Sequence, residues 1–360
     1  MGRQTDNQMG KQTGILKSNQ AAARNYNWDF WKFIAAIGVI LVHAPYKGNL
    51  GSILSSVGVL GVSFFYLISG YACYGEPEKM CPKIRKRLLR NGIITVLAVA
   101  WALAFSYYAM RLEHTEILWK MALKKPVTYV RMIFLGDLEF FYGSHLWFMV
   151  ALLYCYVVFY ILVRFRLKKV IYVMTPVFLL ARIVVETYVN SYSVSWHWSA
   201  NALIGGLPMM LLGYVIADKK EKLVKIPTWI LVVGIILSAG AVFAAMCFKV
   251  GKLNIFQPFN ILCSSLVLIL GAKKPHWSIV KPLSYLGRKD SLYIYLFHFY
   301  IIMIMYEVMY GMHLSSKVIE WQLPLAVIIV SIIVARVFSM LVDLVKLPIK
   351  LRKKKAAQKA

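Results

Sequence analysis

Long apolar stretches alternate with short polar segments along almost the whole chain. A helix that spans a bilayer needs about 20 mainly apolar residues, and ten stretches come close to that length. They lie at residues 28–46, 52–74, 91–110, 145–163, 170–189, 200–217, 227–247, 255–271, 291–311 and 321–343. The pattern predicts an all-α, polytopic membrane protein with about ten transmembrane helices in one bundle.

Composition and charge support this class and predict an orientation. Hydrophobic residues form 60% of the chain and charged residues 16%, which is far more apolar than a soluble protein. Of the 42 Lys and Arg residues, 30 fall in segments on the side of the N-terminus and 9 on the opposite side. The positive-inside rule therefore predicts a multi-pass cell-membrane protein with both termini in the cytoplasm. The net charge of +27 reports this orientation, and no nucleic-acid partner is expected.

The segments outside the bundle divide the chain into three parts. Residues 1–26 are rich in polar residues and lack an apolar core, so they predict a disordered cytoplasmic tail. Residues 27–345 form the membrane domain, and residues 346–360 form a basic cytoplasmic tail. The longest external connection, residues 111–144, contains a semi-apolar run that predicts an interfacial or re-entrant helix over an outward-facing site. The five cysteines have no metal-ligand spacing, so neither a disulfide framework nor a metal site is expected.

The first apolar stretch carries three ionisable residues on one stripe, Asp29, Lys32 and His43. The eleven helical steps from Lys32 to His43 bring both side chains to the same face of a helix within about 20°. A charge at mid-bilayer costs about 2.5–3.5 kcal/mol, which favours a functional role for such residues. The alternative is that all three side chains reach toward the membrane interfaces.

Three further groups are candidates for chemistry. Arg87 and Arg90 lie one helical turn apart after a basic loop and could form a fork for an anionic cofactor, or could anchor the helix at anionic lipids. His145 and Trp147 begin the fourth stretch at the depth of His43, where aromatic residues often belong to the interfacial belt. His298 lies about seven residues into the ninth stretch, and its alternative role is a hydrogen bond between helices.

Buried charges need partners whatever the protein does. Arg182 and Glu186 are four residues apart and predict an ion pair, and Arg336 and Asp343 share one helix face. We expect both pairs to neutralise charge. The small residues of the second apolar stretch favour close packing between helices; they are Gly58, Gly61, Ser69, Gly70 and Ala72.

Taken together in chain order, these motifs resemble the membrane-bound acyltransferase family 3, which includes O-acetyltransferases of bacterial surface polysaccharides. The resemblance rests on Asp29 to His43, Phe64-Phe65 with Ser69-Gly70-Tyr71, Arg87 with Arg90, His145-Leu146-Trp147-Phe148, and Leu286-Gly287 followed by Ser291, Tyr295, Leu296 and His298. Two positions depart from the family pattern. Lys32 stands where the family has arginine, and Ser63 where many members have an acidic residue.

The resemblance implies transfer of an acetyl or other short acyl group from acyl-CoA to a hydroxyl of a surface polysaccharide or envelope precursor. No permanently bound cofactor is implied; acyl-CoA, a sugar acceptor and the bilayer are the partners. The phosphates of the donor should lie where cytoplasmic positive charge is densest, near Arg87 and Arg90. Ser69, Gly70 and Tyr71 belong to the same expected donor site.

The remaining roles follow from the reaction. An imidazole titrates near neutral pH and can take the proton of an attacking hydroxyl, so His43 is the expected base. Lys32 and Asp29 would orient the site or neutralise the donor, and His145, Trp147 and His298 would position the acceptor. Two other functions stay open: a transporter or flippase for a polar or lipid-linked precursor, and a membrane module without catalytic activity.

Overall fold

The computed structural model describes residues 24–247 and 256–359, and all its regular elements in these ranges are helical. The elements that cross or enter the bundle are α2 (Tyr26–His43), α3 (Gly48–Tyr71), α4 (Pro77–Leu112), α7 (Trp147–Arg164), α8 (Lys168–Tyr192), η5 (Ala202–Gly206), α9 (Leu207–Asp218), α11 (Thr228–Cys247), α12 (Gln257–Lys273), α14 (Ser291–Gly311) and α15 (Ser316–Lys359). The connecting elements are α5 (Glu116–Lys124), α6 (Pro126–Val130), η1 (Arg131–Leu135), η2 (Glu139–Phe141), η3 (Ser144–Leu146), η4 (Trp196–Trp198), α10 (Lys220–Leu223) and α13 (Lys281–Lys289). The predicted all-α helix bundle is confirmed.

Each of the ten predicted apolar stretches coincides with a helix. Seven helices in the described ranges are long and apolar enough to cross a membrane. Three apolar helices are shorter, at 126–135, 202–218 and 257–273, and α2 contains the charged Asp29 and Lys32. The membrane class is therefore supported, while ten crossings and cytoplasmic termini stay predictions. Of the tail predicted at residues 1–26, residues 1–23 lie outside the described residues, and so does the connection at 248–254.

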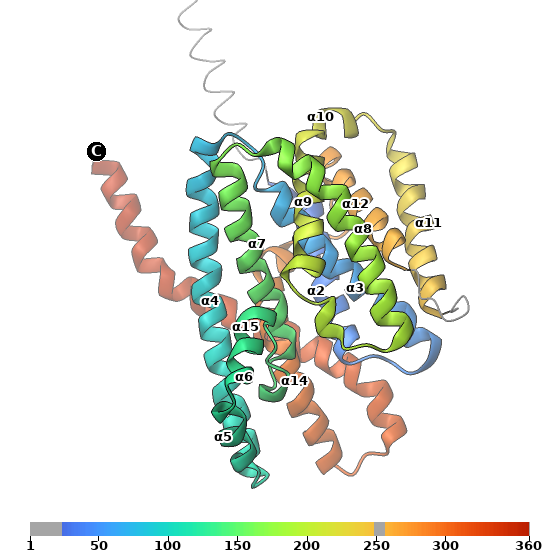
Figure 1. Ribbon diagram of the computed structural model, residues 1–360. Helices are drawn as coiled ribbons and strands as arrows, with labels where there is room; N and C mark the ends of the chain where they lie inside the picture. Colours follow the sequence, from blue (N-terminus) through green and yellow to red (C-terminus); the bar gives the residue numbers. More distant parts are fainter. Residues whose placement is uncertain (1–23, 248–255, 360) are drawn as a thin grey trace, which may run out of the picture.

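Helices α2 and α3 run through the middle of the bundle, with α4 at one edge and α8 and α11 at the other (Figure 1). Helix α2 also packs against α13 and α14. The central contact is close because it is made by small residues: a Cβ on Gly38 of α2 would lie 2.6 Å from the backbone nitrogen of Gly58 on α3. Glycine lets the two backbones meet without side chains between them, as the sequence predicted for this region.

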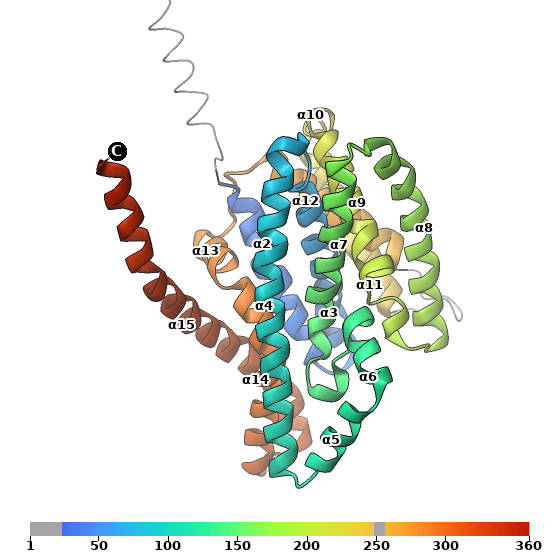
Figure 2. The ribbon, with the colours of Figure 1, turned by 60° about the vertical axis from the view of Figure 1, so that its left-hand side comes forward.

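Two helices extend beyond their predicted apolar stretches. Helix α4 begins at Pro77, so the basic segment before the third stretch is helical and carries Arg87 and Arg90 on a rigid element. Helix α15 continues through the predicted basic tail to Lys359 and slants away from the bundle (Figure 2). Both views show that α2 begins and α15 ends toward the same end of the bundle. This arrangement agrees with an even number of crossings.

The long connection between α4 and α7 is folded at the opposite end. Helices α5 and α6 follow the end of α4, and η1 to η3 lead back to α7 (Figure 2). Residues 126–135 form a short apolar helical run. The helix predicted within residues 111–144 is present.

Candidate functional site

Polar residues at the start of α2 are held by hydrogen bonds to neighbouring elements. Asn25 caps the helix by accepting a hydrogen bond from the backbone N–H of Trp28 at 2.9 Å, and its amide donates to the carbonyl of Gly271 at 2.7 Å. Asp29 is buried in the first turn, where it forms ion pairs with Arg24 and, at 3.3 Å, with Lys32. The two residues that the sequence places one turn apart are thus an ion pair. It leaves the Lys32 ammonium beside an internal cavity.

The two arginines of α4 face the same cavity. Arg87 donates a hydrogen bond from Nη1 to the carbonyl of Ala72 at 2.7 Å, which fixes its guanidinium against the end of α3. Arg90 and the buried Asn91 also line the cavity. Asn91 follows Arg87 by four residues and therefore shares its helix face, a signal that the sequence contains but that was not used to predict it.

The cavity has a volume of about 420 Å³ and lies between α2, α3, α4, α7 and α14. Its basic end is formed by Lys32, Arg87 and Arg90. From Lys32 to the deeper Val39, both on α2, the lining spans seven residues, or about 10 Å along the helix axis. The walls between are mainly apolar and aromatic. The cavity therefore combines a cationic end with an apolar interior.

The three motif residues at the end of α3, Ser69, Gly70 and Tyr71, have different surroundings. Ser69 lines the cavity. Gly70 is instead buried against the backbone of Met210 on α9, where a Cβ would clash. Tyr71 contacts Trp28 edge to face, with ring centroids 4.9 Å apart. Of the three residues, Ser69 is the one placed to touch a molecule in the cavity, while Gly70 and Tyr71 position the helices around it.

Three histidines from α2, η3 and α14 form one cluster. The ring centroid of His298 lies 5.2 Å from that of His43 and 5.1 Å from that of His145. His145 and His298 are completely buried, whereas His43 is partly exposed. Residues that the sequence separates by more than 250 positions thus meet in one cluster.

The hydrogen bonds of the cluster define where protons can be accepted. His298 Nδ1 lies 2.7 Å from the carbonyl oxygen of Tyr295. A carbonyl only accepts, so Nδ1 carries the hydrogen and Nε2 is the free basic nitrogen. That Nε2 is buried without a hydrogen-bond partner in the described part of the chain, and so are both ring nitrogens of His145. Tyr295 adds a hydroxyl, which donates to the carbonyl of His145.

The cluster adjoins the inner end of the cavity. Each histidine lies one helical turn from a residue that lines the cavity wall. These lining residues are Val39, Met149 and Tyr295, which stand next to His43, His145 and His298, respectively. A group entering from the basic end would approach the imidazoles at this wall.

Trp147 lies just outside the cavity lining. It is the first residue of α7, and its ring contacts Phe148 and packs at Gly205, where a Cβ would be 3.3 Å from the indole. The π-helical turn η5 that contains Gly205 is itself held by Arg182, whose Nη1 donates to the Gly205 carbonyl at 2.5 Å. Trp147 is therefore fixed by packing near the histidine cluster.

The predicted ion pair between Arg182 and Glu186 is present at 3.7 Å. Arg182 also donates to Ser63 at 3.1 Å and to Gln257 at 3.3 Å. Ser63 thus stands beside a buried guanidinium, at the position where many family members were expected to carry an acid. Glu186, one turn along α8, supplies the negative charge instead.

The second predicted charge pair is wrong. Arg336 pairs with Asp290 at 3.7 Å and donates to the Tyr285 hydroxyl at 2.9 Å, whereas Asp343 pairs with Lys289. Both partners come from α13 and the residue that follows it. Helix α13 packs against α15 as well as α2. Arg336 and Asp343 on α15 therefore pair with residues of this neighbouring segment and not with each other.

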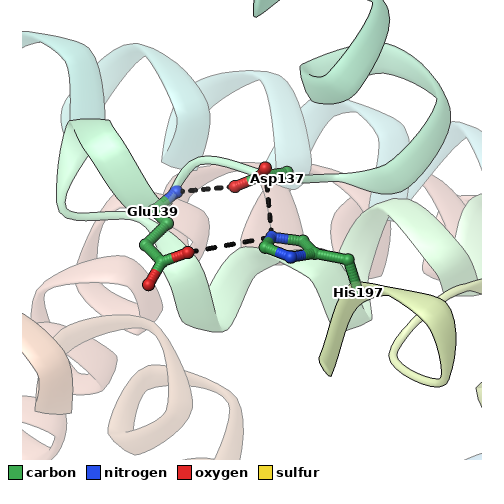
Figure 3. A group of neighbouring side chains, drawn as sticks. All are labelled: Asp137, Glu139 and His197. Carbon is green, nitrogen blue, oxygen red and sulfur yellow. Dashed lines mark hydrogen bonds and ion pairs between the residues drawn. The ribbon is translucent and has the colours of Figure 1, made fainter. Parts of the chain in front are cut away.

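A second polar group lies at the opposite end of the bundle, where Figure 3 shows the His197 ring between the carboxylates of Asp137 and Glu139. His197 Nε2 is 3.0 Å from Asp137 and 3.8 Å from Glu139. These three could together offer metal ligands, but Arg131 already pairs with the Asp137 oxygen that faces His197. We interpret the group as an ion-pair link between the segment after η1 and the segment before η5. His197 has no distinctive sequence pattern around it, so its role was not predicted.

Opposing effects act on the Asp137 carboxyl. Burial would raise its pKa, but the hydrogen bond from the Glu139 backbone N–H, the contact with His197 and the charge of Arg131 outweigh burial and hold the pKa below its usual value. Asp137 is therefore ionised at neutral pH and can pair with Arg131.

A helical bundle that can cross a membrane, with a cationic cavity leading to buried imidazoles, is the architecture of an integral membrane protein with an internal reaction or transport site. The sequence model of the acyltransferase 3 family, described as an acyltransferase domain, matches residues 25–343. The chain therefore belongs to this family, and it is a membrane acyltransferase. No curated protein and no solved structure matches it.

Proposed function

We propose that the protein transfers an acetyl or other short acyl group from acyl-CoA to a hydroxyl of a cell-surface polysaccharide or an envelope precursor. The observation that carries this proposal is the cavity itself, which has Lys32, Arg87 and Arg90 at one end and adjoins the histidine cluster at the other. Acyl-CoA has the complementary form, because its nucleotide end is highly anionic and its thioester arm is long and uncharged. A cell membrane is the location that this reaction requires.

The donor would bind at the basic end. Guanidinium groups make bidentate hydrogen bonds to phosphate, and Arg87 is already oriented by its bond to the Ala72 carbonyl. Lys32 contributes a point charge where the family has a guanidinium, and Asp29 holds it in place. Ser69 lies on the same cavity wall. The apolar walls then accommodate the thioester arm as it reaches toward the cluster.

The chemistry would take place beside His43. The acceptor oxygen attacks the thioester carbonyl while His43 takes the hydroxyl proton, and collapse of the tetrahedral intermediate releases the CoA thiolate, which is then protonated. His43 is partly exposed and contacts His298, so it is the histidine best placed to meet an acceptor. His145, His298 and Trp147 would fix the orientation of the acceptor and of His43.

The test uses purified protein in proteoliposomes, with radiolabelled acetyl-CoA on the side of the basic residues and envelope polysaccharide as acceptor. Label is expected to move to the polymer as a base-labile ester. Mass spectrometry of surface glycans from cells with and without the protein identifies the acyl group and its acceptor. If neither the label nor the glycan masses depend on the protein, the proposed activity is wrong.

A further inference from the structure

A separate basic cavity lies beside the start of α2. It has a volume of about 400 Å³, and its lining includes Arg24, Lys281 and Arg288 together with the hydroxyl groups of Ser278 and Tyr285. Among the described residues that line it, none is Asp or Glu. Three cations and several hydroxyls around one small cavity are the groups that bind phosphate in proteins.

The positive charge of this cavity is largely uncompensated. Lys281 and Arg288 have no ion pair within the described ranges, and Arg24 shares Asp29 with Lys32. Helix α13 begins at Lys281, and no side chain caps its N-terminus, so the helix dipole adds to the positive potential there. Residues 1–23 contain a single acid, Asp6. The segment that precedes Arg24 therefore offers little negative charge to balance this cavity.

An apolar cavity of about 200 Å³ lies next to the basic one. The two share walls, because alternate residues of one segment line them: His276 and Ser278 line the basic cavity, and Trp277 and Ile279 line the apolar cavity. Trp277 is 46% exposed and Ile279 is 60% exposed. Exposed Trp beside cations is typical of protein surfaces at the level of lipid headgroups.

We propose that the two cavities together bind an anionic phospholipid of the adjacent leaflet, with its phosphate among Arg24, Lys281 and Arg288 and an acyl chain along Trp277 and Ile279. A soluble phosphate compound would share the chemistry of the basic cavity. A soluble phosphate compound has no acyl chain that could fill the apolar cavity. The geometry therefore favours the lipid as the occupant. The site is separate from the cavity of the proposed acyl transfer and does not depend on that activity.

The test compares lipid retention by the full chain purified in detergent, measured by native mass spectrometry after incubation with equal amounts of phosphatidylglycerol and phosphatidylcholine. The wild type should retain phosphatidylglycerol preferentially. One Lys or Arg near an anionic surface contributes about 1 kcal/mol, or roughly a fivefold change in affinity. The Lys281→Gln/Arg288→Gln variant should therefore lower the preference about 25-fold.

A matched control removes the same charge from the same end of the bundle. The Lys220→Gln/Lys225→Gln variant changes exposed residues outside both cavities and should retain the wild-type preference. Equal preference in all three proteins would overturn the proposal. A second result would also overturn it. If the Lys281→Gln/Arg288→Gln variant retained lipid as the wild type does but no longer bound 3′,5′-ADP, a soluble phosphate compound, the basic cavity would be a site for such a compound and not for a lipid.

Discussion

At the scale of single residues, the side chains on which the proposed function depends are ionisable groups that line the cavity or adjoin it. Lys32 and the two arginines of α4 line one cavity, and His43, His145 and His298 meet at its inner wall. The sequence predicted each of these residues, since ionisable groups in apolar helices are costly to keep. Asn91 was not assigned to the site, although its spacing of four residues from Arg87 places it on the same helix face, and Tyr295 was named in a motif without a role of its own.

The Arg90→Gln variant tests the basic end of the cavity. We expect the KM for acetyl-CoA to rise about tenfold or more with little change in kcat, because the loss of a hydrogen bond to a charged group costs about 1.5–3 kcal/mol. Steady-state transfer rates at varied acetyl-CoA measure both constants. Arg85→Gln is the control, since Arg85 lies on α4 outside the cavity lining. Equal KM values in both variants would argue against a donor site at Arg90.

At the scale of elements, the apolar pattern predicted every long helix, but it did not predict which helices touch. The third apolar stretch gave no sign that α4 begins at Pro77, because the segment before it is strongly basic, although its buried Met80 and Ile84 are spaced four residues apart as on one helix face. The partners of Arg336 and Asp343 were misjudged for a related reason: α13 is short and amphipathic, and its position between α2 and α15 is a tertiary feature.

The close contact of α2 with α3 predicts a strong effect of Gly38→Val. The new Cβ would lie 2.6 Å from the Gly58 backbone, which cannot move aside as a side chain would. We expect a lower thermal unfolding midpoint in detergent and loss of transfer activity, because the shift displaces Lys32 and His43 on the same helix. Gly240→Val is the matched control, since nothing lies within 4 Å of a Cβ at Gly240. Equal midpoints for the two variants would contradict the packing described.

The link formed by Asp137 predicts a pH-dependent stability. Its pKa in the folded protein is below the ordinary value of 3.8, so the carboxylate stabilises the fold above that pH, and the contribution is lost as the pH falls through the folded-state pKa. Asp137→Asn should therefore lower stability by about 1 kcal/mol or less at pH 7, because solvent screens part of the pairing. The charged and titratable groups in contact are Arg131, Glu139 and His197.

Thermal unfolding of wild type and Asp137→Asn in detergent, from pH 7 down to pH 3, measures this difference. The two midpoints should converge toward the acid end of the range. A difference that stays constant with pH would show that the carboxylate charge is not what stabilises the link.

At the scale of the whole molecule, charge distribution and fold agree. Among the described residues, Lys32, Arg87 and Arg90 form the basic end of the cavity, while the histidine cluster lies toward the connection between α4 and α7. Under the proposed function, a donor from the cytoplasm and an acceptor from outside meet inside one bundle. The apolar pattern and the charge distribution predict the helices and an orientation, whereas the cavity depends on how five helices pack against one another.

The central claim is that His43 acts on a donor bound at the basic end of this cavity. It is tested most directly by the single-turnover rate of acyl transfer in proteoliposomes for wild type, His43→Ala and the control His114→Ala, with acetyl-CoA binding measured in parallel. We predict that His43→Ala binds acetyl-CoA normally and transfers at a rate about 10²- to 10⁴-fold lower, the usual contribution of a general base, while His114→Ala matches the wild type. Transfer by His43→Ala at the wild-type rate would contradict the account.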